Sequence, residues 1–123
     1  MGAPKVLVAE DDHSVRMTIE FVLEDEGFDV HLAGDGAEAL QMARDLLPDV
    51  ILLDQIMPKM DGKEVLTALR AEEATRGIPV LVLSGMSQGS PDDWPGASFV
   101  GKPFAPDALV AQIRGVLHEQ RSS

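Results

Sequence analysis

Five short strand-like segments, the second less apolar than the others and most of them separated by longer stretches with helical periodicity, constrain the fold of this chain most strongly. They occupy residues 5–9, 29–33, 50–54, 79–84 and 97–101. The third, Val50–Asp54, has four large aliphatic residues followed by one aspartate, which is typical of a strand buried on both faces. Strands that alternate with helices form a parallel sheet with helices on both faces and right-handed crossovers. The sequence therefore predicts an α/β fold with a five-stranded parallel sheet.

The stretches between most of these strands predict amphipathic helices. Helices are expected over residues 13–26, 36–47, 62–76 and from Pro106 to near the C-terminus. Asp35 and Asp61 each precede a glutamate by three residues, which is the pattern of a helix-capping pair. Gly27 suits the position just after a helix end.

Residues 85–96 break the alternation. Gly89, Pro91 and Pro95 interrupt any helical period in this segment, so at most one helical turn is expected there. The helix between the fourth and fifth strands is therefore predicted to be short or irregular. Trp94 is interpreted as filling the space over the sheet rather than as an anchor for a partner.

Composition narrows the function classes. The 123 residues contain no repeat or linker, so a single domain over residues 1–123 is expected. Because cysteine is absent, disulfides and cysteine-ligated metals are excluded, in agreement with a reducing, cytoplasmic environment. A net charge of -11 opposes direct nucleic-acid binding. No apolar run reaches the roughly 20 residues of a membrane span, so no membrane insertion is expected.

Chemically useful side chains follow four of the five predicted strands. Glu10 and Asp11 follow the first, Asp54 ends the third, Ser84 ends the fourth, and Lys102 follows the fifth. The carboxyl ends of parallel strands share one sheet edge, where ligands bind in open α/β sheets, so these groups can converge. The sequence therefore predicts a site at this edge.

Crowded carboxylates point to a metal. Two of them about 4 Å apart repel by roughly 4 kcal/mol at an effective dielectric near 20, which favours a bound cation. Hard oxygen ligands without cysteine suit Mg²⁺. With Lys102 and Ser84 beside it, Asp54 is placed to be a nucleophile that forms an aspartyl phosphate. The competing interpretation of residues 10–12 is a helix cap, and Asp61 is assigned to capping.

These motifs resemble those of a response-regulator receiver domain nearly end to end. The matching stretches are residues 8–12 (VAEDD), 52–62 (LLDQIMPKMDG), 82–85 (VLSG) and 102–104 (KPF). The resemblance implies a flavodoxin-like fold with strand order 2-1-3-4-5. It also implies a cytoplasmic protein that is part of a two-component system.

The resemblance also implies a role for each site residue. Asp54 would accept a phosphoryl group from a histidine kinase or histidine phosphotransfer protein. Glu10, Asp11, Asp54 and the carbonyl of Ile56 would hold Mg²⁺. Ser84 and Lys102 would contact the phosphoryl oxygens, and Phe99 would move with Ser84 as a switch that alters a surface for a downstream protein target. The Lys102–Pro103 bond of such domains is usually cis.

Two other function classes remain open at this point. One is a receiver-like interaction module that is never phosphorylated. The other is a Mg²⁺-dependent phosphohydrolase, which fits less well because the chain is short and lacks an Asp-x-Asp motif on its first strand. The receiver interpretation implies transfer to the chain's own Asp54 without independent substrate turnover, hence no enzyme in the usual sense.

Overall fold

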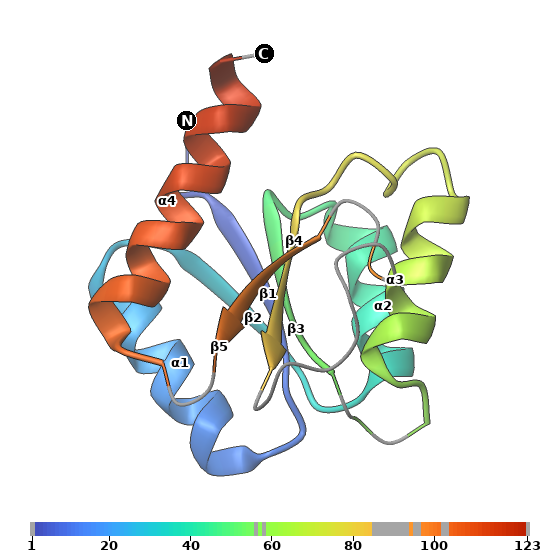
Figure 1. Cartoon of the computed structure of the whole chain (residues 1–123), viewed down its shortest axis with the longest axis horizontal. Coiled ribbons are helices and arrows are strands. Elements are labelled where there is room, and N and C mark those ends of the chain that lie inside the picture. The colour runs from blue at the N-terminus through green and yellow to red at the C-terminus, as the bar shows by residue number, and fades with distance from the viewer. Residues whose placement is uncertain are drawn as a thin grey trace.

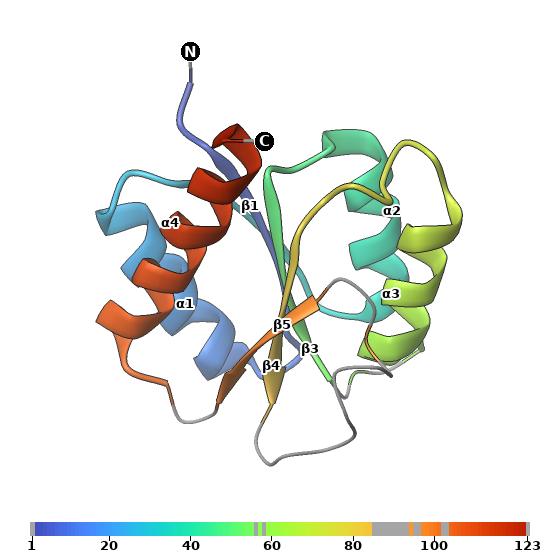
Figure 2. The same ribbon diagram turned by 45° about the horizontal axis from the view of Figure 1, so that its top comes forward.

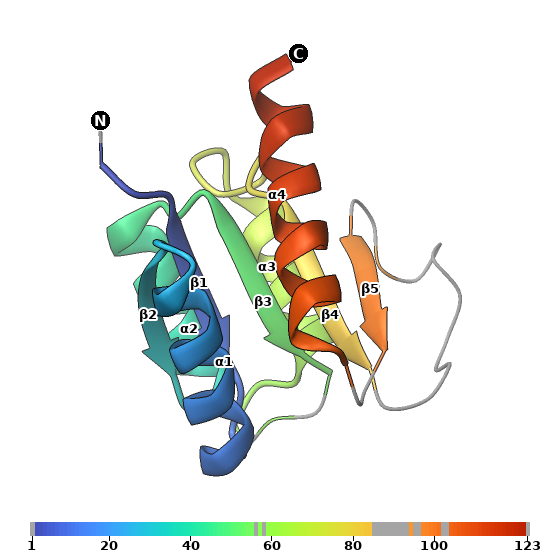
Figure 3. The same cartoon turned by 90° about the vertical axis from the view of Figure 1, so that its left-hand side faces the viewer.

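The computed structural model contains a five-stranded parallel sheet in the order β2-β1-β3-β4-β5 (Figure 3). It describes residues 2–55, 57, 59–84, 94, 97–101 and 104–122, without the side chains of Ser84 and residues 119–122. The elements are β1 (Lys5–Ala9), α1 (His13–Asp25), β2 (Asp29–Ala33), α2 (Gly36–Leu46), β3 (Val50–Asp54), α3 (Gly62–Ala71), β4 (Val80–Ser84), β5 (Ala97–Gly101) and α4 (Pro106–Ser122). The predicted fold class and strand order are confirmed.

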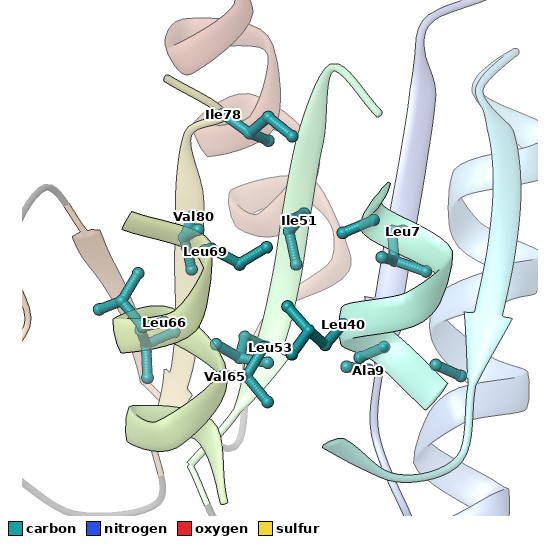
Figure 4. Close-up of a cluster of buried hydrophobic side chains, with 14 of the residues drawn as sticks. Leu7, Ala9, Leu40, Ile51, Leu53, Val65, Leu66, Leu69, Ile78 and Val80 are labelled. Atoms are coloured by element: carbon teal, nitrogen blue, oxygen red, sulfur yellow. The ribbon is translucent and has the colours of Figure 1, made fainter. Parts of the chain in front are cut away.

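Helices cover both faces of the sheet. Helices α1 and α4 lie on one face, and α2 and α3 on the other (Figures 1 and 2). Strand β3 supplies both cores, because Ile51 and Leu53 pack toward α2 and α3 while Val50 and Leu52 pack toward α1 and α4. Figure 4 shows the first of these cores. All five residues of β3 are buried, which is why the segment reads as a continuous apolar run rather than an alternating one.

Capping residues place the helix ends beside the sheet edges. Asp61 accepts a hydrogen bond from the Glu64 N–H while Glu64 accepts one from the Asp61 N–H, which completes the predicted capping box of α3. Gly27, at φ 91°, ends α1 in a Schellman motif, in which the N–H of Phe28 donates to the Leu23 carbonyl at 3.0 Å. Both predicted helix boundaries are confirmed.

Helix α3 is shorter than predicted. It ends at Ala71, whereas helical periodicity was expected to continue to about residue 76. The backbone turns extended at Glu72, and two side chains bond carbonyls in and after the last turn: the Thr75 hydroxyl donates to Leu69 at 2.7 Å, and Arg70 donates to Ile78 at 2.8 Å. These side-chain bonds replace the helical ones and turn the chain toward β4.

Leu47 also departs from the prediction. It was placed on the apolar face of the second helix, but it lies just past α2 in the left-handed region, at φ 47° and ψ 62°, and its exposed fraction is 51%. The left-handed turn reverses the chain before Pro48, which is buried. A leucine at such a position carries the steric cost of its Cβ.

The predicted short or irregular helix over residues 85–96 lies outside the described residues except for Trp94. Trp94 is buried in the core under α2 and α3 and meets Phe99 edge-to-face, with ring centroids 6.0 Å apart. Its interpretation as a space-filling residue is confirmed. Within the described part of the chain, no helix combines the length and apolar character needed to cross a membrane.

Replacing Leu47 by glycine is expected to stabilise the protein. Relief of the left-handed strain, roughly 1–2 kcal/mol, outweighs the extra backbone entropy of glycine, so unfolding should cost about 0.5–1 kcal/mol more. Urea denaturation measures this difference. Leu47→Ala keeps the Cβ and is the control; equal stability of the glycine and alanine variants would contradict the explanation.

The ion pair between α2 and the α3–β4 turn makes a pH-dependent contribution. Arg44 bonds both Glu72 oxygens, at 2.7–3.0 Å, and thereby holds the pKa of the Glu72 carboxyl below its ordinary value. Since the folded pKa is depressed, the stabilisation is present above the unfolded pKa and disappears as pH falls through the folded one.

The wild-type chain should therefore exceed Glu72→Gln in melting temperature at pH 7, and the gap should close as pH falls below the ordinary glutamate range. Thermal melts across this pH range provide the measurement, with Glu73→Gln as a control for the loss of one surface charge. A gap that stays constant with pH would show that the charge of Glu72 is not responsible.

Candidate functional site

Three carboxylates meet at the carboxyl edge of the sheet. Glu10, Asp11 and Asp54 each offer one oxygen, and these oxygens lie within 4.8 Å of one another. The register explains the meeting, because Ala9 of β1 pairs with Leu53 of β3, so the chain places Glu10 and Asp54 side by side at the strand ends. Glu10 is 1% exposed, Asp54 is 7% exposed, and Asp11 is exposed. Two acids are thus held in the protein and the third faces solvent.

The acids after β1 divide into capping and site residues. Asp12 is the N-cap of α1 and accepts a hydrogen bond from the Val15 N–H at 3.2 Å, so the capping interpretation holds for this residue. Its own N–H donates to Glu10 Oε2 at 3.1 Å. Glu10 and Asp11 point instead to Asp54. His13 begins α1 and is exposed, as a surface-helix position would be.

Close backbone packing fixes Asp54. The N–H of Gly62 donates to the Gln55 carbonyl at 2.9 Å, and a Cβ at position 62 would collide with the carbonyl oxygen of Asp54. Only glycine allows the start of α3 to approach the end of β3 this closely. The carboxylate of Asp54 therefore projects from backbone that the neighbouring strands and the start of α3 hold in place.

The β3–α3 loop is also attached to α2. Lys59 adopts φ 69°, and its Nζ lies 3.4 Å from Asp35 Oδ2. The pKa of the Asp35 carboxyl lies below its ordinary value, chiefly because the Glu38 N–H donates to it and further because Lys59 is near. Gly36 packs against the Met60 carbonyl so closely that a Cβ would collide with it. Sequence reasoning missed this attachment, because a contact between separate loops leaves no periodic signal.

The donor set fits a hard divalent cation. Ligands on opposite sides of Mg²⁺ are about 4.2 Å apart, so three oxygens within 4.8 Å can reach one ion with small side-chain adjustments. A cation would also offset the repulsion among the three acids. The residues present therefore fit Mg²⁺ with water or phosphate oxygens completing its shell.

The structure describes the other predicted site residues only in part. Ser84 ends β4 and directly follows Leu83, the register partner of Asp54, so its backbone is at the same edge. Phe99 is half-buried in β5, against Trp94, and its carbonyl accepts a hydrogen bond from Gln112 of α4 at 3.4 Å. Ile56, Lys102 and the predicted cis bond at Pro103 lie outside the described residues.

Comparisons with known proteins identify the family. The response regulator receiver domain model matches residues 6–114. The DNA-binding response regulator MtrA of Mycolicibacterium smegmatis is 37% identical over 123 residues, which cover 92% of this chain and 50% of MtrA. The chain thus spans about half the length of this relative.

Solved receiver domains share the fold. The Francisella response regulator 1452 receiver domain has a TM-score of 0.86 and 32% identity, covering 95% of this chain and 98% of that one. The receiver domain of sensor histidine kinase PA1611 from Pseudomonas aeruginosa has a TM-score of 0.89 and 26% identity, covering 95% and 99%, and holds a magnesium ion in its active-site cleft. The chain belongs to the response-regulator receiver domains of two-component systems.

Proposed function

We propose that Asp54 accepts a phosphoryl group from a phosphohistidine of a histidine kinase or histidine phosphotransfer protein, in a Mg²⁺-dependent reaction. The buried Asp54 carboxylate, with two further carboxylates within 4.8 Å, is the observation that carries this proposal. An Asp54 oxygen attacks phosphorus, the P–N bond to histidine breaks, and the imidazole leaves with its electron pair and takes up a proton.

The chain's residues have distinct tasks in this reaction. Glu10, Asp11 and Asp54, with the Ile56 carbonyl, would hold Mg²⁺, which when bound offsets negative charge on the acids and the phosphoryl oxygens. The backbone contact at Gly62 keeps the nucleophile oriented. Ser84 ends β4, Lys102 directly follows the neighbouring strand β5 in the sequence, and both would bind phosphoryl oxygens. The added phosphoryl group carries a charge of about -1.5 to -2 at pH 7. It would shift the side chains of Ser84 and Phe99 toward a second conformation.

The output is proposed to be a changed protein surface. MtrA carries the description DNA-binding, and this chain spans about half of it. We attribute no nucleic-acid contact to the present domain, because its net charge of -11 repels phosphates. Its readout would pass to a protein target or to another part of a longer protein.

Phosphorylation at Asp54 is tested with acetyl phosphate, Mg²⁺ and intact-mass spectrometry. One phosphoryl adduct is expected on the wild-type chain and none on Asp54→Asn or after chelation of Mg²⁺. Asp61→Asn is the matched control and should retain the adduct, since asparagine also caps a helix. An adduct on Asp54→Asn would refute the assignment, steady phosphate release would indicate a phosphohydrolase, and no wild-type adduct would indicate an interaction module.

The phosphoryl group is expected to be long-lived. In the family, the side chains two residues past the phosphorylated aspartate and past the conserved hydroxyl residue flank the water that attacks the phosphoryl group. In this chain those positions are Ile56 and Met86, which are both apolar and both lie outside the described residues. Isoleucine has no hydrogen-bonding group in its side chain and the methionine sulfur is only a weak acceptor, so neither side chain positions a water well. The decay of the adduct after removal of the donor measures the lifetime, which Met86→Asn should shorten. A wild-type half-life of seconds would contradict this expectation.

A further inference from the structure

Arg16, at the end of the first turn of α1, holds the backbone from which the acidic pair projects. We propose that it is a positioning residue for metal binding, which fixes the β1–α1 loop so that Glu10 and Asp11 face Asp54. This inference rests on the proposed function, because it concerns the same Mg²⁺ site. It adds a residue that does not itself coordinate the ion.

The contact with Glu10 is direct. Arg16 is half-buried, and its Nη1 donates to the Glu10 carbonyl at 2.9 Å, a charge-assisted hydrogen bond. The N–H of Glu10 donates in turn to the Ala33 carbonyl of β2 at 3.2 Å. Both backbone groups of Glu10 are therefore held, one by the neighbouring strand and one by the guanidinium.

The guanidinium also lies against the next loop. A Cβ at Gly34 would be 3.2 Å from Nη1 of Arg16, so the missing side chain leaves room for it. The Gly34 N–H donates to Glu38 Oε1 at 2.7 Å, which fixes this loop to α2. Arg16 thus lies between the loops that follow β1 and β2.

The contacts continue to Asp54. The Asp35–Lys59 pair and the packing of Gly36 on Met60 join the β2–α2 loop to the β3–α3 loop. The loops that follow β1, β2 and β3 are therefore connected, and Arg16 provides a side-chain contact between the first and second of them. Movement of Arg16 is expected to loosen the spacing of Glu10 and Asp11 relative to Asp54.

Two effects of Arg16 on Mg²⁺ affinity have opposite signs. As a cation near the site, Arg16 repels Mg²⁺, so its removal would tighten binding. As a positioning residue, it preorganises the ligands, and loss of such a partner typically weakens metal binding by about 10–100-fold. Arg16 is half-buried and its guanidinium bonds the backbone of the ligand residue Glu10, so the positioning effect is expected to be larger than the repulsion.

The experiment measures the Mg²⁺ dissociation constant of the full chain by isothermal titration calorimetry. Arg16→Gln is expected to raise it by about 10-fold or more. Arg16→Lys keeps the charge and one donor and should fall between Arg16→Gln and the wild type. Arg114→Gln is the matched control, because Arg114 also donates to a residue that flanks α1, Glu26 at 2.8 Å, but at the opposite end of that helix. This variant should leave the constant unchanged.

Circular dichroism at the titration temperature establishes that each variant is folded, and Arg16→Lys alone supplies the test if Arg16→Gln unfolds. Lower stability with an unchanged dissociation constant would overturn the proposal, because Arg16 would then be merely structural. Tighter binding in Arg16→Gln would overturn it in favour of charge repulsion. A wild-type chain that binds no Mg²⁺ would overturn the proposed function itself and this inference with it.

Discussion

The meeting of three carboxylates at one edge of a parallel sheet is the constraint on which the rest of the site depends. Like charges this close are unfavourable together, and two of the acids are buried. The register of β1 and β3 imposes the meeting, and the buried residues of β3 hold it in place through both cores. The stability gained from core packing thus offsets the repulsion among the carboxylates. A bound cation would reduce that repulsion.

The loops that follow β2 and β3 pack closely against neighbouring backbone. Gly62 and Gly36 are positions where any side chain would collide with a neighbouring carbonyl, and Lys59 adopts a left-handed backbone that favours glycine. Gly62 fixes the end of β3 against α3, and the contacts of Gly36 and Lys59 join the β3–α3 loop to the start of α2. Preorganisation of this kind suits phosphoryl transfer, in which positioning and charge stabilisation supply most of the catalysis.

Sequence patterns predicted the parts of the molecule that depend on local chemistry. The central strands β1, β3 and β4 were evident because mostly buried strands are read as runs of apolar residues. The capping box at Asp61 was evident because it has a fixed spacing. Clustering of Glu10, Asp11 and Asp54 followed from the parallel topology. The predicted end of α3 and the predicted helical position of Leu47 were wrong. The hydrogen bond of the Thr75 hydroxyl and the left-handed backbone of Leu47 override helical periodicity at these two places. The contacts of Arg16 with Glu10 and of Lys59 with Asp35 join separate loops, and only the three-dimensional structure shows them.

Glu10, Asp11 and Asp54, the last of which is the proposed phosphorylation site, are expected to hold a single metal ion. Nuclear magnetic resonance with Mn²⁺ in place of Mg²⁺ tests it most directly, since the paramagnetic ion broadens amide signals near its binding site. The account predicts broadening centred on Glu10, Asp11 and Asp54, with little effect at Gly27 at the other end of α1. Broadening spread over the acidic surface, or centred on Glu24 and Asp25, would contradict it.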